Sequence, residues 1–371
     1  MRISASNKLR VRVALYAAFV GLARRQFKHV SKDPLRSDGS LPKGLRVFFW
    51  TPGSGPGANV IVHDMLPSLQ RQIAELSLDW HVSAGPEVPA QALDWLVCFK
   101  AVPEASQRSA ASRTLLLICD RAEMFWDRLS SFHAVVGTSS RPFAQLLAMG
   151  HKDVIFISES EPTEYLDFGK RGLSVSPVER GNVLLWHGGQ YSQDALVQLR
   201  PVLERWAALT DARLHVIGGQ ASPREEHWGK LAVQFLPWSK KQLFCSAAMA
   251  RLGIIPARKG LTRSWLKPAS RVRCLYALGV PTVGDSRVPD VVDFMAGFDG
   301  PMAQQNETWF AVIEKLWNDK AALQQVAIAG HAAVAGEFST EHTARQWVRL
   351  LSQMCAKSGE SLCEVSRTDG R

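Results

Sequence analysis

The 371-residue sequence lacks the cysteine patterns of metal-binding and disulfide-rich proteins. Its six cysteines form no CxxC pair, and none is spaced from a histidine as in a zinc site. Several lie inside apolar runs, as Cys98 does in residues 95–99 (WLVCF). We therefore expect buried, reduced thiols and no metal site.

Long apolar runs are also missing. The longest uncharged apolar run near the start covers residues 13–23, and a helix of that length spans about 16 Å against a hydrocarbon core of roughly 30 Å. Arg10 and Arg12 precede this run, so a cleaved signal peptide remains an alternative. The pair at 24–25 (RR) follows it and opposes translocation. A cytoplasmic location is expected.

The positive charge is concentrated at one end of the chain. The net charge is +10, and residues 1–44 hold ten Arg and Lys against two Asp, which leaves +8 there and +2 elsewhere. Residues 1–30 combine these cations with the apolar 13–23 run, which predicts a helix lying on an anionic membrane surface. A soluble helix packed on the first domain is the alternative. No basic stripe with interleaved aromatic residues is present, so nucleic acid is not expected as a partner.

From residue 45 onward, short apolar runs alternate with helical patterns. In the first half, strands are expected at 45–50, 78–82, 94–99, 114–119, 133–137 and 153–157. In the second half, they are expected at 182–186, 214–217, 233–236, 252–255 and 281–283. Alternation of this kind predicts an α/β protein with parallel sheets covered by helices.

The two sets of strands are separated by an irregular passage at 174–180, so two Rossmann-like domains are expected. The expected boundaries are a basic segment at 1–44, a first domain at 45–178, a second domain at 179–338, a C-terminal helix at 339–357 and a disordered tail at 358–371. Parallel sheets bind ligands beyond the carboxyl ends of their strands, so the loops that follow strands are the candidate sites.

In the first half, a glycine-rich loop follows the first strand. Gly53, Ser54, Gly55 and Gly57 could let the backbone approach a ligand at the start of the next helix. The spacing is not that of a dinucleotide-binding fingerprint, and a plain loop is the alternative. Asp120 directly follows another strand, where it could act as a general base or simply cap the next helix.

In the second half, His187, Gly188 and Gly189 form the first strand-to-helix turn. The two glycines should expose backbone N–H groups there, while His187 either contacts a ligand or is a solvated loop residue.

The strongest candidate is the basic segment 258–273, which lies in a stretch from 227 to 284 without any acidic residue. Lys267, Ser270 and Arg271 stand at the start of a helix expected to run from Pro268 to residue 279, and Arg258 precedes them. The N–H groups of residues 269–271, the helix dipole and the cations should together bind a diphosphate. A solvated basic face is the alternative.

Taken in order, these pieces make the chain similar to the GT-B glycosyltransferases of bacterial surface-polysaccharide pathways. The matching segments are 183–189 (VLLWHGG), 214–219 (LHVIGG), 235–239 (FLPWS), 253–256 (GIIP), 267–271 (KPASR) and 276–281 (YALGVP). The resemblance covers roughly residues 45–355. It implies two Rossmann-like domains facing across a cleft, with the C-terminal helix crossing back to the first domain.

The resemblance also implies an activity: transfer of a sugar from a nucleotide-diphosphate-sugar donor to a glycan or lipid-linked glycan acceptor. The donor would bind His187, Gly188, Gly189, Arg258, Lys267, Ser270 and Arg271. The acceptor would lie near the 53–57 loop, with Asp120 as the first choice for a base and His63 and Asp64 as weaker ones. GT-B enzymes typically use protein cations where GT-A enzymes use a metal, and no DxD sequence occurs here. Neither a metal nor another cofactor is expected.

The chain departs from the family pattern at one position. Many retaining members carry two glutamates seven residues apart near 255–270, and this chain has no glutamate from 227 to 306. The stereochemical outcome therefore stays open. A catalytically silent scaffold or carbohydrate-binding protein of a polysaccharide assembly complex is the alternative function.

Overall fold

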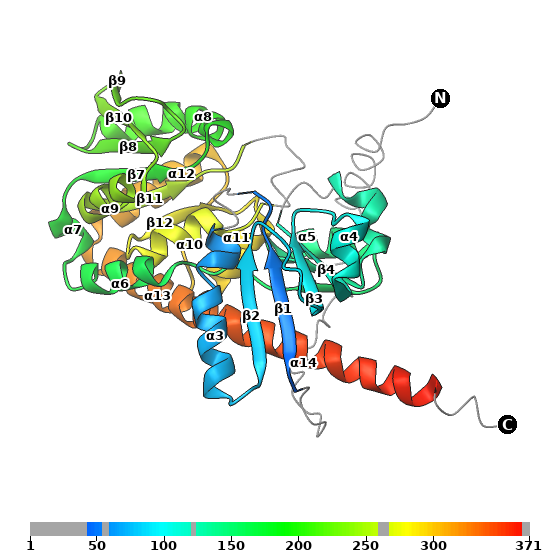
Figure 1. The fold of residues 1–371 in the computed structure, drawn as a ribbon. Coiled ribbons are helices and arrows are strands. Elements are labelled where there is room, and N and C mark those ends of the chain that lie inside the picture. The colour runs from blue at the N-terminus through cyan, green and yellow to red at the C-terminus, as the bar shows by residue number, and fades with distance from the viewer. Residues whose placement is uncertain (1–42, 54–58, 120–123, 259–266, 366–371) are drawn as a thin grey trace, which may run out of the picture. The chain divides into compact units, whose positions relative to one another are not determined.

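A computed structural model of the chain describes residues 43–53, 59–119, 124–258 and 267–365. The chain divides into two compact units (Figure 1). Unit 1 contains residues 1–160 and 340–371, and unit 2 contains Glu161–Ser339. The division thus comes at residue 160, earlier than the expected boundary at 178, because helices α6 (Thr163–Gly172) and α7 (Pro177–Arg180) pack within unit 2 rather than unit 1.

Unit 1 is built on a six-stranded parallel sheet of order β2-β1-β3-β4-β5-β6. Its strands are β1 (Leu45–Trp50), β2 (Trp80–Gly85), β3 (Leu93–Phe99), β4 (Ala111–Ile118), β5 (Ala134–Gly137) and β6 (Val154–Phe156). Each of the six corresponds to an expected strand, with ends that differ by a few residues. The central strands are buried on both faces, as continuous apolar sequences require in a parallel sheet.

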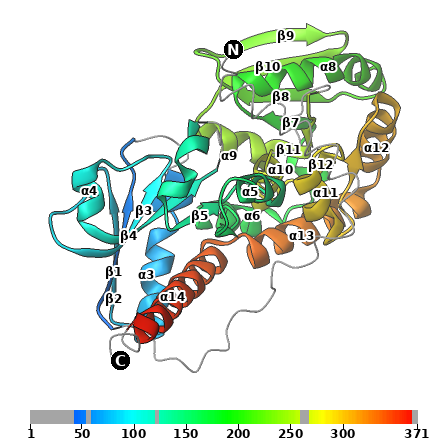
Figure 2. The same ribbon diagram turned by 90° about the vertical axis from the view of Figure 1, so that its right-hand side faces the viewer.

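The helices of unit 1 complete its core. They are η1 (Asn59–His63), α3 (Leu66–Glu75), α4 (Ala105–Ser109), η3 (Trp126–Ser131), α5 (Arg141–Ala148) and α14 (Thr340–Val365). The C-terminal α14 packs beside α3 (Figure 2), and Ser68 Oγ donates to Thr340 Oγ1 at 3.1 Å. Trp347 packs edge-on against Phe49 of β1, with ring centroids 5.0 Å apart. The C-terminal helix therefore belongs to unit 1, as expected.

Unit 2 holds a seven-stranded sheet of order β13-β12-β11-β7-β8-β10-β9. Its strands are β7 (Val183–His187), β8 (Arg213–Gly218), β9 (Arg224–Trp228), β10 (Leu231–Pro237), β11 (Ala250–Ile255), β12 (Thr282–Asp285) and β13 (Met302–Ala303). All pairs are parallel except β9 with β10. The carboxyl ends of β7, β8, β10, β11 and β12 consequently meet at one edge of this sheet.

The helices of unit 2 cover this sheet and close its core. They are α6 (Thr163–Gly172), α7 (Pro177–Arg180), α8 (Gln190–Ala207), α9 (Lys240–Met249), α10 (Ser270–Ala277), α11 (Pro289–Ala296), α12 (Asn306–Asn318) and α13 (Lys320–Glu337). Helix α6 approaches α10 closely, because a Cβ atom on Gly169 would lie 2.0 Å from the carbonyl oxygen of Ala277. This contact explains why α6 belongs to unit 2.

The elements differ from expectation in three places, one of which is the short edge strand β13, which was not expected. The sequence around β9 (REEHW) was not expected to form a strand, but it pairs antiparallel with β10 as the edge of the sheet. An exposed edge strand keeps charged side chains, so it carries no apolar pattern. The tail expected to be disordered from residue 358 is helical as far as Val365, and residues 366–371 lie outside the described part.

Candidate functional site

The site begins where β7 ends. His187 is the last residue of β7, and helix α8 starts at Gln190, with Gly189 as its N-cap. Gly188 lies between them, and its N–H donates to the carbonyl of Ile217 at 3.0 Å. This bond ties the turn to the end of β8. The positive end of the 18-residue helix α8 therefore lies at the carboxyl edge of the sheet.

His187 is a buried histidine and not a solvated loop residue. Its side chain and backbone together are 7% exposed, and its Nε2 lies 2.9 Å from the carbonyl oxygen of Arg271. Burial, together with the smaller effect of the nearby Arg271 cation, lowers the pKa of His187 to about 4, although the hydrogen bond to the carbonyl opposes this. The imidazole is therefore neutral near pH 7, and Nε2 carries the proton that the carbonyl accepts.

Arg271 lies in the first turn of α10, directly behind the glycine turn. A Cβ atom built on Gly188 would lie 3.0 Å from Arg271 Nη1 and 3.1 Å from the Trp186 ring. Burial lowers the pKa of Arg271 to about 10, against the attraction of Asp285. Within the described ranges, the buried Nη1 has no hydrogen-bond partner. A desolvated cationic donor without a partner is costly unless an anion completes the site.

The space around Gly189 is open, whereas the space around Gly188 is crowded. A Cβ atom on Gly189 would meet no atom within 4 Å. A ligand can therefore approach the backbone at Gly189 and the start of α8, whereas Gly188 holds the turn against Arg271. The glycine at 188 provides a close approach between β7 and α10 that any side chain would disturb.

Known structures share this architecture. The chain matches a glycosyltransferase from Rickettsia africae with a TM-score of 0.59 and 10% identity, covering 84% of this chain and 98% of that one. It matches Anabaena HepE, solved in complex with UDP and glucose, with a TM-score of 0.56 and 12% identity, covering 83% of this chain and 100% of that one. It matches sucrose-phosphate synthase from Thermosynechococcus elongatus with a TM-score of 0.56 and 12% identity, covering 84% of this chain and 100% of that one.

The chain has the GT-B fold. Its neighbours are GT-B glycosyltransferases, and their likeness covers 83–84% of this chain. No protein-family model matches the sequence, and no curated protein matches it. At 10–12% identity the likeness concerns the fold, so the role of each residue depends on the geometry of this chain.

In the GT-B fold of this chain, three of the expected donor residues form one cluster: His187, Gly188 and Arg271. Ser270 is adjacent as the first residue of α10, and Lys267 is exposed three residues before it. Two details differ from expectation. Helix α10 runs from Ser270 to Ala277, shorter than expected at both ends. The N–H of Ala269 does not face outward but donates to Asp290 Oδ2 at 2.6 Å.

The basic segment also has carboxylate neighbours. Although the basic segment itself holds no acidic residue, other elements supply them. Arg258 Nη1 lies 3.1 Å from Asp194 Oδ2 on α8, and both side chains are about half exposed. Arg258 is therefore paired on the surface rather than available as an uncompensated cation. Residues 259–266 lie outside the described part of the chain.

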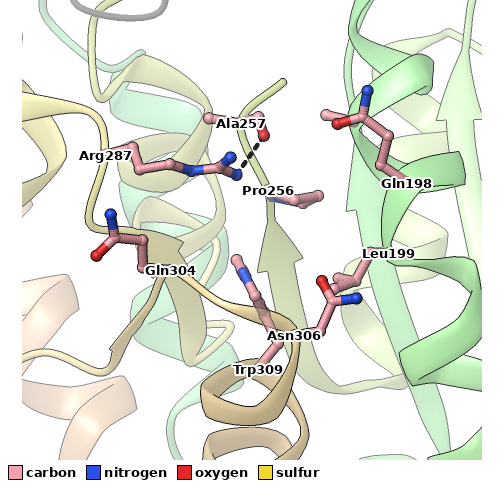
Figure 3. Close-up of a pocket in the computed structure, with 9 residues that line it drawn as sticks. Gln198, Leu199, Pro256, Ala257, Arg287, Gln304, Asn306 and Trp309 are labelled. Carbon is pink, nitrogen blue, oxygen red and sulfur yellow. Dashed lines mark hydrogen bonds between the residues drawn. The ribbon is translucent and has the colours of Figure 1, made fainter. Parts of the chain in front are cut away.

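Sequence reasoning missed Asp285, the buried last residue of β12. Its Oδ1 accepts from the N–H and Nε of Arg287 at 3.0 and 2.8 Å, and its Oδ2 accepts from the Ala257 N–H at 2.8 Å. Arg287 Nη2 donates in turn to the Ala257 carbonyl at 2.5 Å (Figure 3). This clamp fixes the chain as it leaves β11. The signal was present, because an acidic residue at a strand end qualifies as a candidate, but the strand was expected to end at Val283.

Trp238 is a second residue that was missed. It directly follows β10, its N–H donates to the Gly218 carbonyl at 2.8 Å, and it is 52% exposed. An exposed tryptophan at the carboxyl edge of a sheet offers a face on which a planar ring can stack. From the sequence, segment 235–239 (FLPWS) contributes only to the family resemblance.

The hollow beside this edge is small. The cavity in Figure 3 has a volume of about 10 Å³, enough for one water molecule. Its lining includes Gln198 of α8, Pro256 and Ala257 directly after β11, and Arg287 after β12, whose side chain points toward Ala257. A larger hollow of about 430 Å³ lies in unit 1 near α4, before β3 and β4, and therefore away from the carboxyl edge.

In unit 1, the expected acceptor residues are described only in part. Gly53 is exposed after β1, and His63 Nε2 lies 3.4 Å from the hydroxyl of the buried Thr51. Asp64 follows His63 and is exposed. Asp120, Ser54, Gly55 and Gly57 lie outside the described residues. Both His63 and Thr51 stand at the carboxyl end of β1.

Within the described ranges, no group of three or more His, Cys, Asp or Glu residues could hold a metal ion. In the same ranges, no helix combines the length and apolar character needed to cross a bilayer.

Proposed function

We propose that this chain is a glycosyltransferase that moves a sugar from a nucleotide-diphosphate-sugar donor to a glycan or lipid-linked glycan, in cell-surface polysaccharide biosynthesis. The observation that carries the proposal is the buried Arg271 Nη1, a cationic donor with no partner among the described residues, at the glycine turn of a GT-B fold. Its chemistry suits a phosphate oxygen.

The donor diphosphate would be bound by charge and by backbone donors together. Arg271 contributes a buried guanidinium, exposed Lys267 contributes a second cation, and the start of α8 at Gly189 contributes its helix dipole. His187 keeps Arg271 in place through its carbonyl and stays neutral, so it adds no competing positive charge at pH 7. Trp238 offers its exposed face to the base.

The same groups would assist the reaction. When the bond from the sugar to the diphosphate breaks, negative charge grows on the leaving phosphate. Arg271, Lys267 and the dipole of α8 stabilise this charge, and they are most effective where water is excluded. These protein cations take the role that a metal plays in other glycosyltransferases, so we propose transfer without a metal or another cofactor.

The acceptor would bind to unit 1. Gly53, His63 and Asp64 follow β1, and a hydroxyl acceptor needs a nearby base if the enzyme inverts. Asp120, which follows β4, remains our first choice for that base, with His63 and Asp64 as the alternatives. The loop of Ser54, Gly55 and Gly57 would approach the acceptor through its backbone.

UDP is the nucleotide to test first, because HepE and an α-glucosyltransferase of similar fold were solved with UDP bound. A thermal-shift screen would compare UDP, GDP, dTDP and CMP, and their sugars. A ligand at 100 times its Kd stabilises the protein by about 2.7 kcal/mol. A stabilising nucleotide sugar is then incubated with the protein, and release of free nucleotide is measured. Binding without hydrolysis or transfer would favour the silent scaffold, and no stabilisation by any of them would contradict the proposal.

We also propose that residues 1–30, which lie outside the described part, hold the protein on the inner face of the cell membrane. Each cation near an anionic leaflet contributes about 1 kcal/mol, so binding should weaken with salt. The full chain should sediment with anionic vesicles, and a chain lacking residues 1–30 should not. Equal sedimentation of both would favour a helix packed on the first domain.

A further inference from the structure

The chain passes between the two units twice, and both passages are joined inside unit 2. The first is at residues 160–161 and the second at 339–340. Glu161 and Ser339 form a parallel β-bridge, and the Glu161 N–H donates to the Phe338 carbonyl at 2.7 Å. The backbone on either side of the two passages is therefore held as one structural element.

Arg273 contacts this element from helix α10. It is one of the largest fully buried side chains, with 2% exposure. Its Nε lies 3.7 Å from Glu161 Oε1, and its Cζ lies 4.4 Å from the centroid of the Phe338 ring. Arg273 thus contacts Glu161 at the first passage and Phe338 directly before the second.

On its other side, Arg273 reaches the start of α10. Its Nη1 lies 3.7 Å from Asp290 Oδ2, and the same oxygen accepts the N–H of Ala269 at 2.6 Å. Ala269 is the N-cap of α10 and precedes Ser270 and Arg271 of the candidate donor site. A continuous chain of contacts therefore runs from Glu161 through Arg273 and Asp290 to the first turn of that helix.

Glu161, Arg273 and Asp290 form a buried triad of charges, and stability alone does not explain it. Glu161 and Asp290 are 5% and 8% exposed, so two carboxylates and one guanidinium are largely removed from water. Among the described residues, Nε and Nη2 of Arg273 make no hydrogen bond, although the charges are paired. Buried ion pairs of this kind are often no more stable than apolar residues of similar volume, and their best-attested benefit is fixing one arrangement.

We propose that Arg273 is a positioning residue that couples the two chain passages at Glu161 and Ser339 to the first turn of α10, and so sets the affinity of the donor site for the diphosphate. Both carboxylates lie against the guanidinium of Arg273. Loss of the Glu161 charge lets Arg273 move toward Asp290, which changes the hold of Asp290 on the Ala269 N–H. The affinity effect rests on the proposed function, whereas the contact chain does not.

The test compares Glu161→Gln, Arg273→Met and the double variant with the unmodified full-length chain. Titration calorimetry with UDP measures affinity, and hydrogen exchange of the Ala269 and Ser270 amides measures the hold on α10. Each single variant should change UDP affinity roughly 2–30-fold, as couplings through packed networks do. The double variant should match Arg273→Met, because Glu161 acts through Arg273. Arg273→Lys should retain part of the affinity, since it keeps the charge.

Glu164→Gln is the matched control. Glu164 lies in α6, three residues after Glu161, is exposed and pairs with Lys240. Its loss should therefore change neither the UDP affinity nor the amide exchange. Melting curves show whether each variant folds. A lower melting temperature with unchanged UDP affinity and unchanged amide exchange in Glu161→Gln would overturn the proposal, as would additive effects in the double variant. If the unmodified chain binds no nucleotide, the proposed function fails, and amide exchange still decides whether the coupling exists.

Discussion

The imidazole Nε2 of His187 lies 2.9 Å from the backbone carbonyl oxygen of Arg271. These residues are 84 positions apart, and the bond joins the end of β7 to the first turn of α10. The bond fixes the backbone of α10 at Arg271, whose guanidinium contacts the glycine turn. A neutral imidazole suits this place, because a proton added to the ring would lie beside a second cation.

The depressed pKa of His187 predicts a loss of stability in acid. The unfolded chain takes up this proton near pH 6.5, whereas the folded protein takes it up only near 4. Below pH 6.5 the unfolded state binds more protons, so the free energy of unfolding falls as the pH falls. The difference amounts to about 3 kcal/mol between pH 7 and pH 4.

His187→Gln keeps an N–H donor but cannot titrate. Urea unfolding at pH 7, 5.5 and 4.5 should show the unmodified chain losing stability faster than this variant. His215 and His331 also have pKa values lowered by burial, and their contribution is common to both proteins. Parallel curves for the two proteins would contradict a buried, neutral His187.

Removing either cation of the candidate donor site should weaken nucleotide binding, and removing Arg271 should do so without lowering stability. A charge-assisted hydrogen bond contributes about 1.5–3 kcal/mol, so Arg271→Ala and Lys267→Ala should each weaken binding roughly 10–150-fold. Arg271→Ala also removes a desolvated charge, so the melting temperature of the free protein should stay the same or rise. Calorimetric titration with UDP, with melting curves alongside, measures both.

Arg205→Ala is the control for these variants. Arg205 lies in the last turn of α8, is half exposed and pairs with Glu307, so it removes the same charge at the other end of that helix. Its UDP affinity should equal that of the unmodified chain. Unchanged affinity in Arg271→Ala and Lys267→Ala together would remove the donor site from α10.

The two glycines of the turn should respond differently to alanine. A Cβ on Gly188 would press on Arg271 Nη1 at 3.0 Å and on the Trp186 ring, so Gly188→Ala should destabilise the protein by about 1–3 kcal/mol. A Cβ on Gly189 meets no atom within 4 Å, and its φ of −71° suits any residue. Gly189→Ala should therefore leave stability nearly unchanged.

The Gly189→Ala variant also tests where the ligand binds. If the diphosphate approaches the backbone at Gly189, then Gly189→Ala should still weaken UDP binding, because the new methyl group occupies the approach. Equal stability and equal UDP affinity in Gly189→Ala would place the diphosphate elsewhere.

Substitutions at Asp120 and His63 distinguish between these two candidates for the base. If Asp120 is the base, Asp120→Asn should lower kcat roughly 10²–10⁴-fold with donor affinity nearly intact, and His63→Ala should have little effect. The reverse pattern would favour His63, whose ring lies beside the Thr51 hydroxyl. Near-normal turnover in Asp120→Asn with a lower melting temperature would indicate a helix cap instead.

The parallel strands could be predicted from the sequence because each is a short apolar run, as in residues 45–50 and 183–187. The edge strand β9 could not, since its residues are charged. Individual glycines and cations of the candidate donor site could be proposed from their positions after strands, and their role stays a prediction. Their partners could not be proposed in this way: Asp290 binds Ala269 across 21 residues, and Asp194 reaches Arg258 across 64. Only the fold brings such pairs together, so a segment without acidic residues is not a segment without carboxylate neighbours.

The charged edge strand β9 affects how the protein behaves when it is concentrated. Arg224 and Glu225 are exposed along it, and Arg224 pairs with Glu226 at 2.7 Å. A second molecule that paired its own strand here would have to bring like charges together and dehydrate them. The strand therefore works against edge-to-edge aggregation, and replacing its charged residues with valine or threonine would make the protein prone to form fibrous precipitates during purification.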